Sequence, residues 1–171
     1  MKSNELLLDT FGRIRETVAE ALGCVDDEAL VHQPTGNGNS MAWLIWHLGR
    51  VENAQVGAAV GLEQVWTSQG VACRFNLPLS ERDTGYAHLT HQLDAVRAPR
   101  HLLREYYDAV HGQTVHFLNT VDDEALDRIV DPRWDRPPTL GGRLVRTIAG
   151  CLQYVGQAAY AKGLKTTQAY G

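Results

Sequence analysis

Apolar residues recur every three or four positions in four long segments, and this spacing constrains the fold more than any other feature of the chain. Such a repeat places apolar side chains on one face of an α-helix. The segments run from about residue 7 to 22, 41 to 60, 99 to 121 and 140 to 163. Four amphipathic helices without a convincing strand predict an all-α protein, a four-helix bundle formed by a single domain over residues 1–171.

Local signals mark where the predicted helices begin and end. Gly23 follows the first helix at the position of a left-handed C-cap, and Ser40 is placed to cap the second. The stretch between them, rich in Gly, Asn and Pro towards its end, is expected to form a loop. Pro99 suits the first turn of the third helix.

Two longer connections separate the later helices. Residues 61–99 form a long, partly ordered connection with a short helical pattern near 88–96, and residues 121–139 form a second irregular segment. Long connections of this kind often border functional pockets. Residues 165–171 are expected to form a frayed tail.

Composition excludes several classes of function. The chain has 171 residues, 44% hydrophobic and 21% charged, with a formal net charge of −4, which does not favour nucleic-acid binding. The first residues lack the apolar core of a signal peptide, and no apolar stretch is long enough to span a bilayer, so we expect a cytoplasmic protein without a membrane partner. Three widely spaced cysteines favour free thiols over a disulfide framework or a thiolate zinc site.

Several blocks of the sequence together resemble the DinB superfamily, and more narrowly its actinobacterial-type branch. They occur in the family's order between about residues 5 and 164: NSMAWLIWHLGRVE, DTGYAH, EYYDAVHGQT, PRWDRPPTLGGRLV and LQYVGQAAYAKG. The resemblance implies a four-helix bundle with a long crossover between helices two and three, frequent homodimers, and a divalent metal, often zinc or nickel. It also implies activities of the kind known in the family, thiol-dependent transfer and isomerisation with mycothiol or bacillithiol.

The family's metal ligands are incomplete in this chain. The resemblance places His47 at the ligand position of the second helix, but Gly150 and Tyr154 at the two histidine positions of the fourth. A catalytic divalent metal needs about three protein ligands, and neither glycine nor a protonated phenol is suitable. We therefore expect no metal cofactor. Zinc or nickel held by His47, Cys151 and a group from the crossover is the alternative.

His47 and Tyr154 are the candidate catalytic residues, because an imidazole beside a phenol in an apolar pocket suits proton transfer. The competing interpretation of His47 is a core histidine with satisfied ring nitrogens. Aromatic and polar residues near the expected pocket are candidate ligand contacts: Trp43, Trp66, Phe75, Cys151 and His111.

Other polar residues are interpreted as surface groups. His88 and His91, in the sequence HLTH, have a chelating spacing but no third ligand, so we expect them to be solvated. Glu52, Asp83 and Asp108 are possible acid or base groups, but we expect their carboxylates on wet helix faces.

Three functions remain open. The first is a DinB-like protein with a degenerate metal triad that binds a small organic molecule, such as a low-molecular-weight thiol, in a mostly apolar pocket and carries out metal-independent acid/base chemistry. The second is a metal-dependent thiol S-transferase or isomerase with altered ligands. The third is a non-catalytic dimeric accessory protein.

Overall fold

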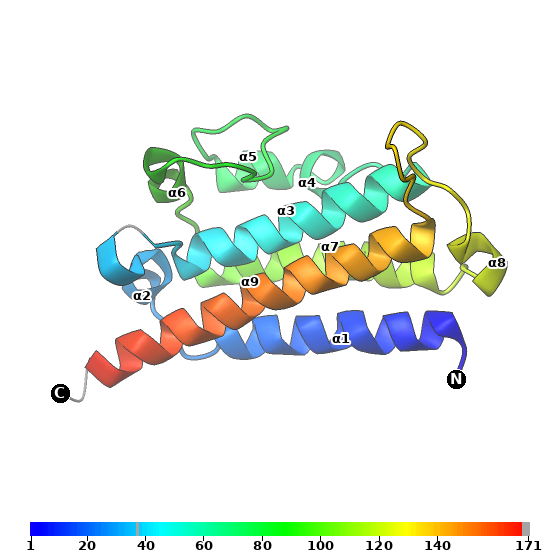
Figure 1. Cartoon of the computed structure of the whole chain (residues 1–171). Coiled ribbons are helices and arrows are strands. Elements are labelled where there is room, and N and C mark those ends of the chain that lie inside the picture. The colour runs from blue at the N-terminus through cyan, green and yellow to red at the C-terminus, as the bar shows by residue number, and fades with distance from the viewer. Residues whose placement is uncertain (37, 169–171) are drawn as a thin grey trace.

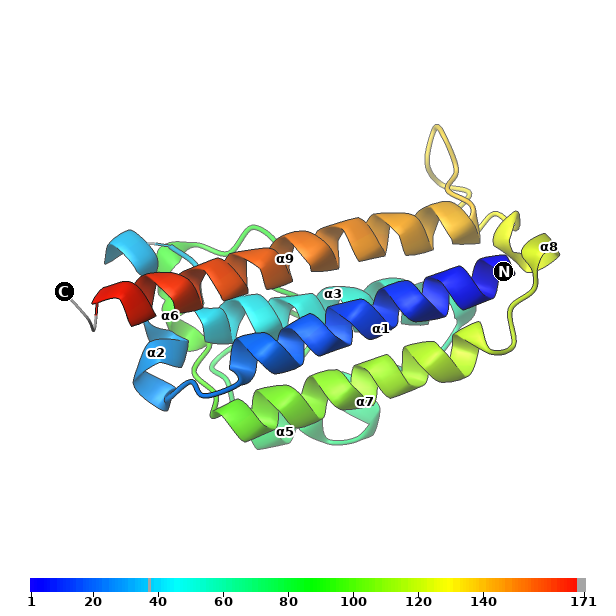
Figure 2. The same cartoon turned by 90° about the horizontal axis from the view of Figure 1, so that it is seen from below.

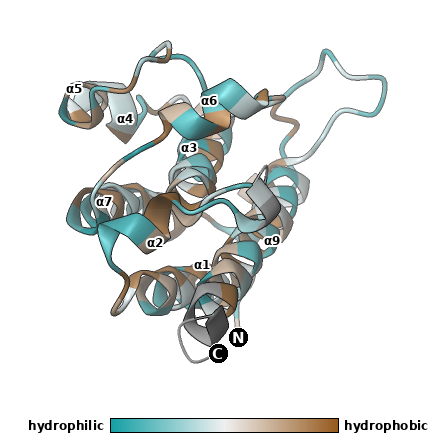
Figure 3. Ribbon diagram, turned by 90° about the vertical axis from the view of Figure 1, so that its left-hand side faces the viewer, coloured by the Kyte–Doolittle hydropathy of each residue, from teal (hydrophilic) through white to brown (hydrophobic). Residues whose placement is uncertain are grey.

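The computed structural model describes residues 1–36 and 38–168, and four long helices form its bundle (Figure 1). These helices are α1 (Ser3–Leu22), α3 (Met41–Val60), α7 (Arg100–Leu118) and α9 (Leu140–Gln168). Both α1 and α3 pack against α7 and α9, so the four helices surround a common core, as the view along the bundle shows (Figure 3). The predicted all-α bundle is confirmed, with no strand in the described ranges beyond an isolated bridge between Ile129 and Thr139.

The crossover gives the bundle its topology. The chain runs in one direction in α3 and α7 and in the other in α1 and α9 (Figures 1 and 2). A long connection must therefore return the chain from the end of α3 to the start of α7, as predicted. It contains α4 (Val65–Ser68), α5 (Val71–Phe75) and α6 (Thr90–Ala95), which lie on the outer side of α3 (Figure 1).

Helix α3 is the most enclosed element of the molecule. All residues from Met41 to Arg50 are buried, because α2 (Asp27–Val31), α4, α7 and α9 pack around it. A helix that is apolar on nearly every side is stable in this position, where each buried Leu or Ile side chain contributes roughly 1.5–3 kcal/mol. Even so, none of the described helices combines the length and apolarity needed to cross a membrane.

Several helix ends differ from the sequence prediction. Ser40 caps α3 as expected, its Oγ accepting a hydrogen bond from the amide of Trp43 at 3.2 Å. Gly23 does not adopt a left-handed conformation, with φ at −66°, and Cys24 does so instead, with φ at 55°. Pro99 precedes α7 as its N-cap residue rather than lying in its first turn.

Short helices replace parts of the predicted loops. The segment after Cys24 contains α2 and the 3₁₀ turn η1 (Pro34–Gly36). The side chain of Asp26 caps α2 by accepting a hydrogen bond from the amide of Ala29. The segment before α9 contains α8 (Asp123–Leu126). Helix α9 continues past its predicted end at Gly163 to Gln168, so the expected frayed tail is helical up to this residue, and residues 169–171 lie outside the described part.

Candidate functional site

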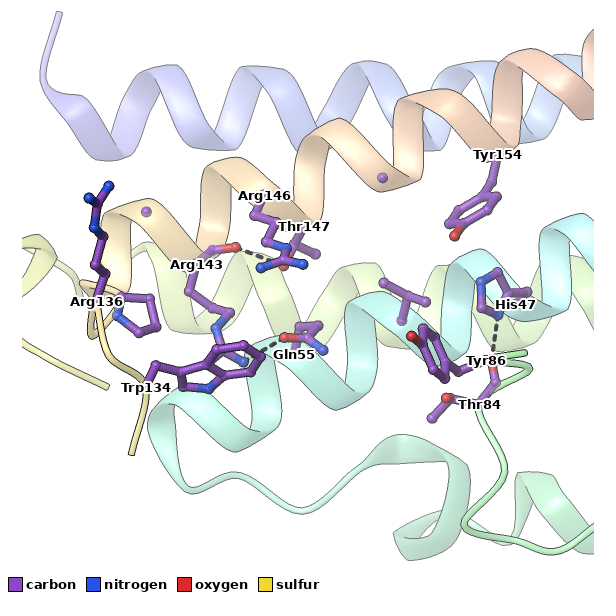
Figure 4. Close-up of a pocket in the computed structure, with 14 residues that line it drawn as sticks. His47, Gln55, Thr84, Tyr86, Trp134, Arg136, Arg143, Arg146, Thr147 and Tyr154 are labelled. Atoms are coloured by element: carbon purple, nitrogen blue, oxygen red, sulfur yellow. Dashed lines mark hydrogen bonds between the residues drawn. The ribbon is translucent and has the colours of Figure 1, made fainter. Parts of the chain in front are cut away.

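A cavity of about 470 Å³ lies between α3 and α9 (Figure 4). This volume is within the range of small-molecule sites. Helix α3 contributes His47, Val51 and Gln55, and the crossover contributes Thr84 and Tyr86. Helix α9 and the loop before it supply the rest of the wall: Trp134, Arg136, Pro138, Gly142, Arg143, Arg146, Thr147, Gly150 and Tyr154.

Small residues on α9 leave the space open. Arg143, Thr147, Gly150 and Tyr154 follow one another at helical spacing, so they share the face of α9 that is turned to α3. A Cβ added at Gly150 would have one neighbour within 4 Å outside its own backbone, a ring carbon of Tyr154 at 3.8 Å. Because no side chain projects from Gly150, the ring of His47 borders open space.

The ring of His47 is held in one orientation by its neighbours. Trp43 stacks against it, with ring centroids 4.5 Å apart, and Tyr154 contacts it edge to face at the same separation. The Nδ1 atom of His47 lies 2.5 Å from the carbonyl oxygen of Thr84. A carbonyl oxygen only accepts hydrogen bonds, so Nδ1 carries the proton and Nε2 keeps a free lone pair.

Burial keeps this imidazole neutral. His47 is 4% exposed, and desolvation lowers its pKa below the usual value, although the hydrogen bond to Thr84 opposes the shift. At neutral pH the side chain is therefore a base with its acceptor nitrogen available. Figure 4 shows the His47 ring and the Tyr154 hydroxyl beside the same open space between α3 and α9.

The loop that carries Thr84 is fixed by a polar network. Asp83 accepts hydrogen bonds from the amide of Gly85 at 2.8 Å and from Nε2 of His88 at 2.9 Å. Trp43 donates to Nδ1 of His88 at 3.0 Å. The side chain of His88 is 2% exposed, so the prediction of a solvated histidine is wrong, because the loop folds its imidazole onto α3.

Gly85 is required for the close approach of this loop. Its φ is 89°, and a Cβ at this position would lie 2.5 Å from Nδ1 of His47. A side chain here would both strain the backbone and collide with the candidate base. The glycine of the DTGYAH block therefore allows the Thr84 carbonyl to reach His47.

Arg50 anchors the crossover from the interior of α3. It is 1% exposed and donates to the carbonyl oxygens of Asp83 at 3.0 Å and Glu81 at 3.1 Å and to Oε1 of Gln64 at 2.8 Å. Its guanidinium also lies 4.7 Å from the centre of the Trp66 ring. These contacts compensate the buried charge and hold the crossover in place beside His47.

The aromatic residues predicted at the pocket do not line the cavity. Trp66 and Phe75 pack against each other and against Tyr106, with ring centroids 5.1–5.7 Å apart, on the side of α3 turned away from α9. Trp43 is buried behind His47 and supports its ring. Their positions follow from the path of the crossover, which periodicity does not define.

Cys151 and His111 are also outside the cavity. Cys151 is fully buried, because it lies about 100° further round α9 than Gly150. Its neighbour across the core is Glu52, which is fully buried as well and accepts hydrogen bonds from Tyr107 and Thr114, both at 2.8 Å. The prediction that Glu52 lies on a wet face is wrong. His111 is half-buried on α7 beside Tyr107.

The donor set around His47 does not fit a catalytic divalent metal. Within residues 1–36 and 38–168, no group of three or more His, Cys, Asp or Glu side chains is arranged to hold an ion. Next to His47 stand a phenol and a glycine, and the thiol of Cys151 is directed into the core rather than the cavity. His47 is a single strong ligand, whereas a catalytic metal site usually has three protein ligands.

The sequence interpretation missed the polar residues at the other end of the cavity. Gln55 of α3 accepts a hydrogen bond from Arg143 of α9 at 2.6 Å, and Arg143 lies 3.6 Å from Asp131. Arg146 borders the same space. Polar side chains are therefore concentrated at this end of the cavity. The helical spacing of Arg143, Thr147, Gly150 and Tyr154 is the signal that would have indicated this face.

Comparisons with known proteins identify the family. The model of the DinB superfamily matches residues 10–156. The chain belongs to the DinB superfamily. A crystal structure of a conserved protein from Enterococcus faecalis is similar, with a TM-score of 0.87 and 28% sequence identity over 95% of this chain and 96% of that one. A comparison with curated proteins gives no match. The superfamily prediction is confirmed, and the narrower actinobacterial-type branch stays a prediction.

Proposed function

We propose that this DinB-superfamily protein binds a small organic molecule between α3 and α9 and that His47 and Tyr154 exchange a proton with it without a metal. The observation that supports this most directly is the hydrogen bond between Nδ1 of His47 and the Thr84 carbonyl. It leaves the lone pair of Nε2 available at the wall of a cavity of about 470 Å³.

His47 acts as the base in this proposal. A neutral imidazole at neutral pH accepts a proton from the bound molecule, and the Thr84 carbonyl and the stacked Trp43 ring hold its orientation. Tyr154 supplies a hydroxyl that donates a hydrogen bond to an oxygen, nitrogen or sulfur atom of the ligand. Positioned acid/base groups of this type contribute on the order of 10²- to 10⁴-fold to a rate.

The donor set argues against a metal-dependent thiol transferase or isomerase. No step of the proposed chemistry passes through zinc or nickel, because Gly150 and Tyr154 occupy the positions at which the family's ligands would stand. A low-molecular-weight thiol is still suitable as the bound molecule, since a thiol can lose its proton to His47. The third candidate, a non-catalytic accessory protein, differs from the other two because it would bind no small molecule.

We also propose that the protein acts as a cytoplasmic homodimer. The support for the dimer is a row of exposed apolar residues along α9: Val145 at 61% exposure, Leu152 at 46% and Tyr160 at 70%. A second copy packing on this row would remove these side chains from water. Light scattering at micromolar concentration is expected to give twice the 18.9 kDa mass of one chain.

A thermal-shift screen with small organic acids, amides and thiols tests the proposed function. We expect some of these compounds to raise the melting temperature of the wild-type protein, with or without EDTA, and the purified protein to contain well under one equivalent of zinc or nickel. Gly150→Leu fills the cavity beside His47 and should abolish the shifts. Gly112→Leu, at an exposed position of α7 with no atom near its added Cβ, is the matched control.

Shifts that persist in Gly150→Leu would place the ligand elsewhere and contradict the proposal. Stoichiometric metal that is lost in His47→Ala would contradict its metal-independent part. If no compound in the screen binds, the accessory-protein interpretation is favoured.

A further inference from the structure

Two arginines of α9 lie at the end of the cavity opposite His47. Arg143 and Arg146 are in the first two turns of α9, and both line the cavity (Figure 4). Neither is needed for the proton transfer proposed for His47. Arg136 also borders the cavity, but its side chain points away from the other two in Figure 4 and is not included in the site.

These two side chains differ in how far they are already paired. Arg143 donates to Gln55 and lies 3.6 Å from Asp131, whose carboxylate also accepts from Arg133 at 2.9 Å and from the indole of Trp134 at 3.0 Å. Arg146 forms no hydrogen bond or ion pair with any side chain in the described ranges, although it stands at the cavity wall. Its donors are available to a ligand.

The electrostatic balance of the cavity favours an anion. None of the described residues that line it is an aspartate or glutamate, while the lining includes Arg143 and Arg146. Asp131 offsets part of the charge of Arg143 from outside the lining. The N-terminal turns of α9 add partial positive charge of the same sign. Arginine presents a planar set of donors that matches the oxygens of a carboxylate or phosphate.

The two ends of the cavity set the length of the ligand. His47 and Gln55 are separated by eight residues of α3, which correspond to a rise of about 12 Å. Because Arg143 is bonded to Gln55 at 2.6 Å, an anion bound there would lie roughly this far from His47. Val51, Tyr86, Trp134 and Thr147 line the space, and they suit an apolar or aromatic body.

We propose that the cavity selects organic oxyanions, with the anionic group bound by Arg143 and Arg146 and an apolar body extending to His47. This inference rests on the proposed function, since it names the class of molecule that the same cavity binds. A neutral molecule of the same shape would lose the contacts with Arg146 and bind more weakly.

A pair of fluorescent dyes tests the charge selectivity. The anionic probe is 8-anilinonaphthalene-1-sulfonate, and the neutral one is N-phenyl-1-naphthylamine, which has the same aromatic body. Dissociation constants are measured by fluorescence titration for the wild type and Arg146→Gln. We expect the dissociation constant of the anionic dye to rise about tenfold in Arg146→Gln and that of the neutral dye to change less than twofold.

Arg100→Gln is the matched control. Arg100 is an exposed arginine at the start of α7 outside the cavity, so its loss changes the net charge by the same amount and should affect neither dye. Equal affinities for the anionic dye in the wild type and Arg146→Gln would overturn the inference. An equal loss in Arg100→Gln would also overturn it, because the effect would then reflect net charge.

Gly150→Leu separates this inference from the proposed function. If it weakens both dyes while Arg146→Gln changes neither, the cavity binds organic molecules without selecting anions, and only the inference fails. If both dyes bind and Gly150→Leu leaves them unchanged, or if neither dye binds the wild type, the proposed function fails as well. Circular dichroism of each variant verifies that the bundle is folded.

Discussion

The side of α3 that faces α4, α5 and α7 is the more closely packed: the cavity beside Trp46 and Trp66 has a volume of about 240 Å³, whereas the side that faces α9 borders the cavity of about 470 Å³. On the packed side, Trp46, Trp66 and Tyr106 interlock, and even a Cβ added at Gly49 would lie 2.7 Å from the Tyr106 ring. On the open side, Gly150 and Thr147 of α9 leave a cavity. Large aromatic residues therefore fill the core of this bundle, and small residues on the facing helix create its pocket.

The largest effect expected from this difference is on stability. Trp66 is 3% exposed on the packed side, so Trp66→Ala should lower the free energy of unfolding by about 3–5 kcal/mol. Trp134 is 60% exposed at the cavity, so Trp134→Ala should change the free energy of unfolding by about 0.5 kcal/mol or less. Urea denaturation measures both values. Similar losses in the two variants would show that the cavity wall is as tightly packed as the core.

The two sides of α3 also differ in the direction in which their contribution to stability changes with pH. Burial raises the pKa of Glu52 to about 7 despite its hydrogen bonds from Thr114 and Tyr107. The folded state therefore binds this proton more tightly than the unfolded state, and the stabilisation is lost as the pH rises through about 7. His47 behaves in the opposite way, because burial lowers its pKa in the folded state. Its contribution to stability is present above the pKa of the unfolded state and is lost as the pH falls through the lowered pKa.

Glu52→Gln tests the packed side of this difference. Between pH 6 and 8 the melting temperature of the wild type should fall by about 2–4 °C relative to that of Glu52→Gln, because the amide is neutral throughout. Thermal unfolding followed by circular dichroism measures the difference. In His47→Gln the melting temperature should fall less than in the wild type as the pH is lowered. Its decrease at alkaline pH should be the same as in the wild type. Parallel pH profiles for the wild type and Glu52→Gln would contradict the assignment of the alkaline-side loss to Glu52.

The smallest expected effect concerns two glycines of α9. Gly150→Ala and Gly156→Ala should each stabilise the protein by about 0.5–1 kcal/mol, because alanine favours a helix and neither added Cβ has a contact closer than 3.8 Å. In Gly150→Ala the methyl group also enters the cavity, so the affinity for N-phenyl-1-naphthylamine should fall. Gly156→Ala should leave this affinity unchanged. Equal dye affinities in both variants would indicate that Gly150 does not border the binding site.

The sequence predicts the long helices because their apolar spacing is a local property. Ser40 marks the start of α3, and the four apolar repeats correspond to α1, α3, α7 and α9. The positive φ of Cys24 and the short helices α4 and α5 are not visible in periodicity, since their conformations depend on packing against other elements. Gly23 lacks the Cβ that disfavours a left-handed cap, but the chain adopts this conformation one residue later, at Cys24.

The candidate site was predictable only where the family's register defines it. The resemblance placed His47 opposite Gly150 and Tyr154, and the structure brings these three residues to one cavity. The sequence interpretation did not identify the roles of Thr84, His88 and Arg50, because nothing local shows that the crossover folds back onto α3. Trp66 and Phe75 were expected at the pocket for the same reason, as residues of a segment whose path was unknown.

The parallel course of α3 and α7 has a consequence for synthesis on the ribosome. Helix α9, which covers the cavity side of α3, begins at Leu140, and α3 ends at Val60. At roughly 5–20 residues per second, several seconds pass between the completion of α3 and the appearance of α9. During this interval the side of α3 that α9 covers in the folded protein has no partner, so the nascent chain exposes an apolar surface, and the cavity forms only after α9 has closed this side.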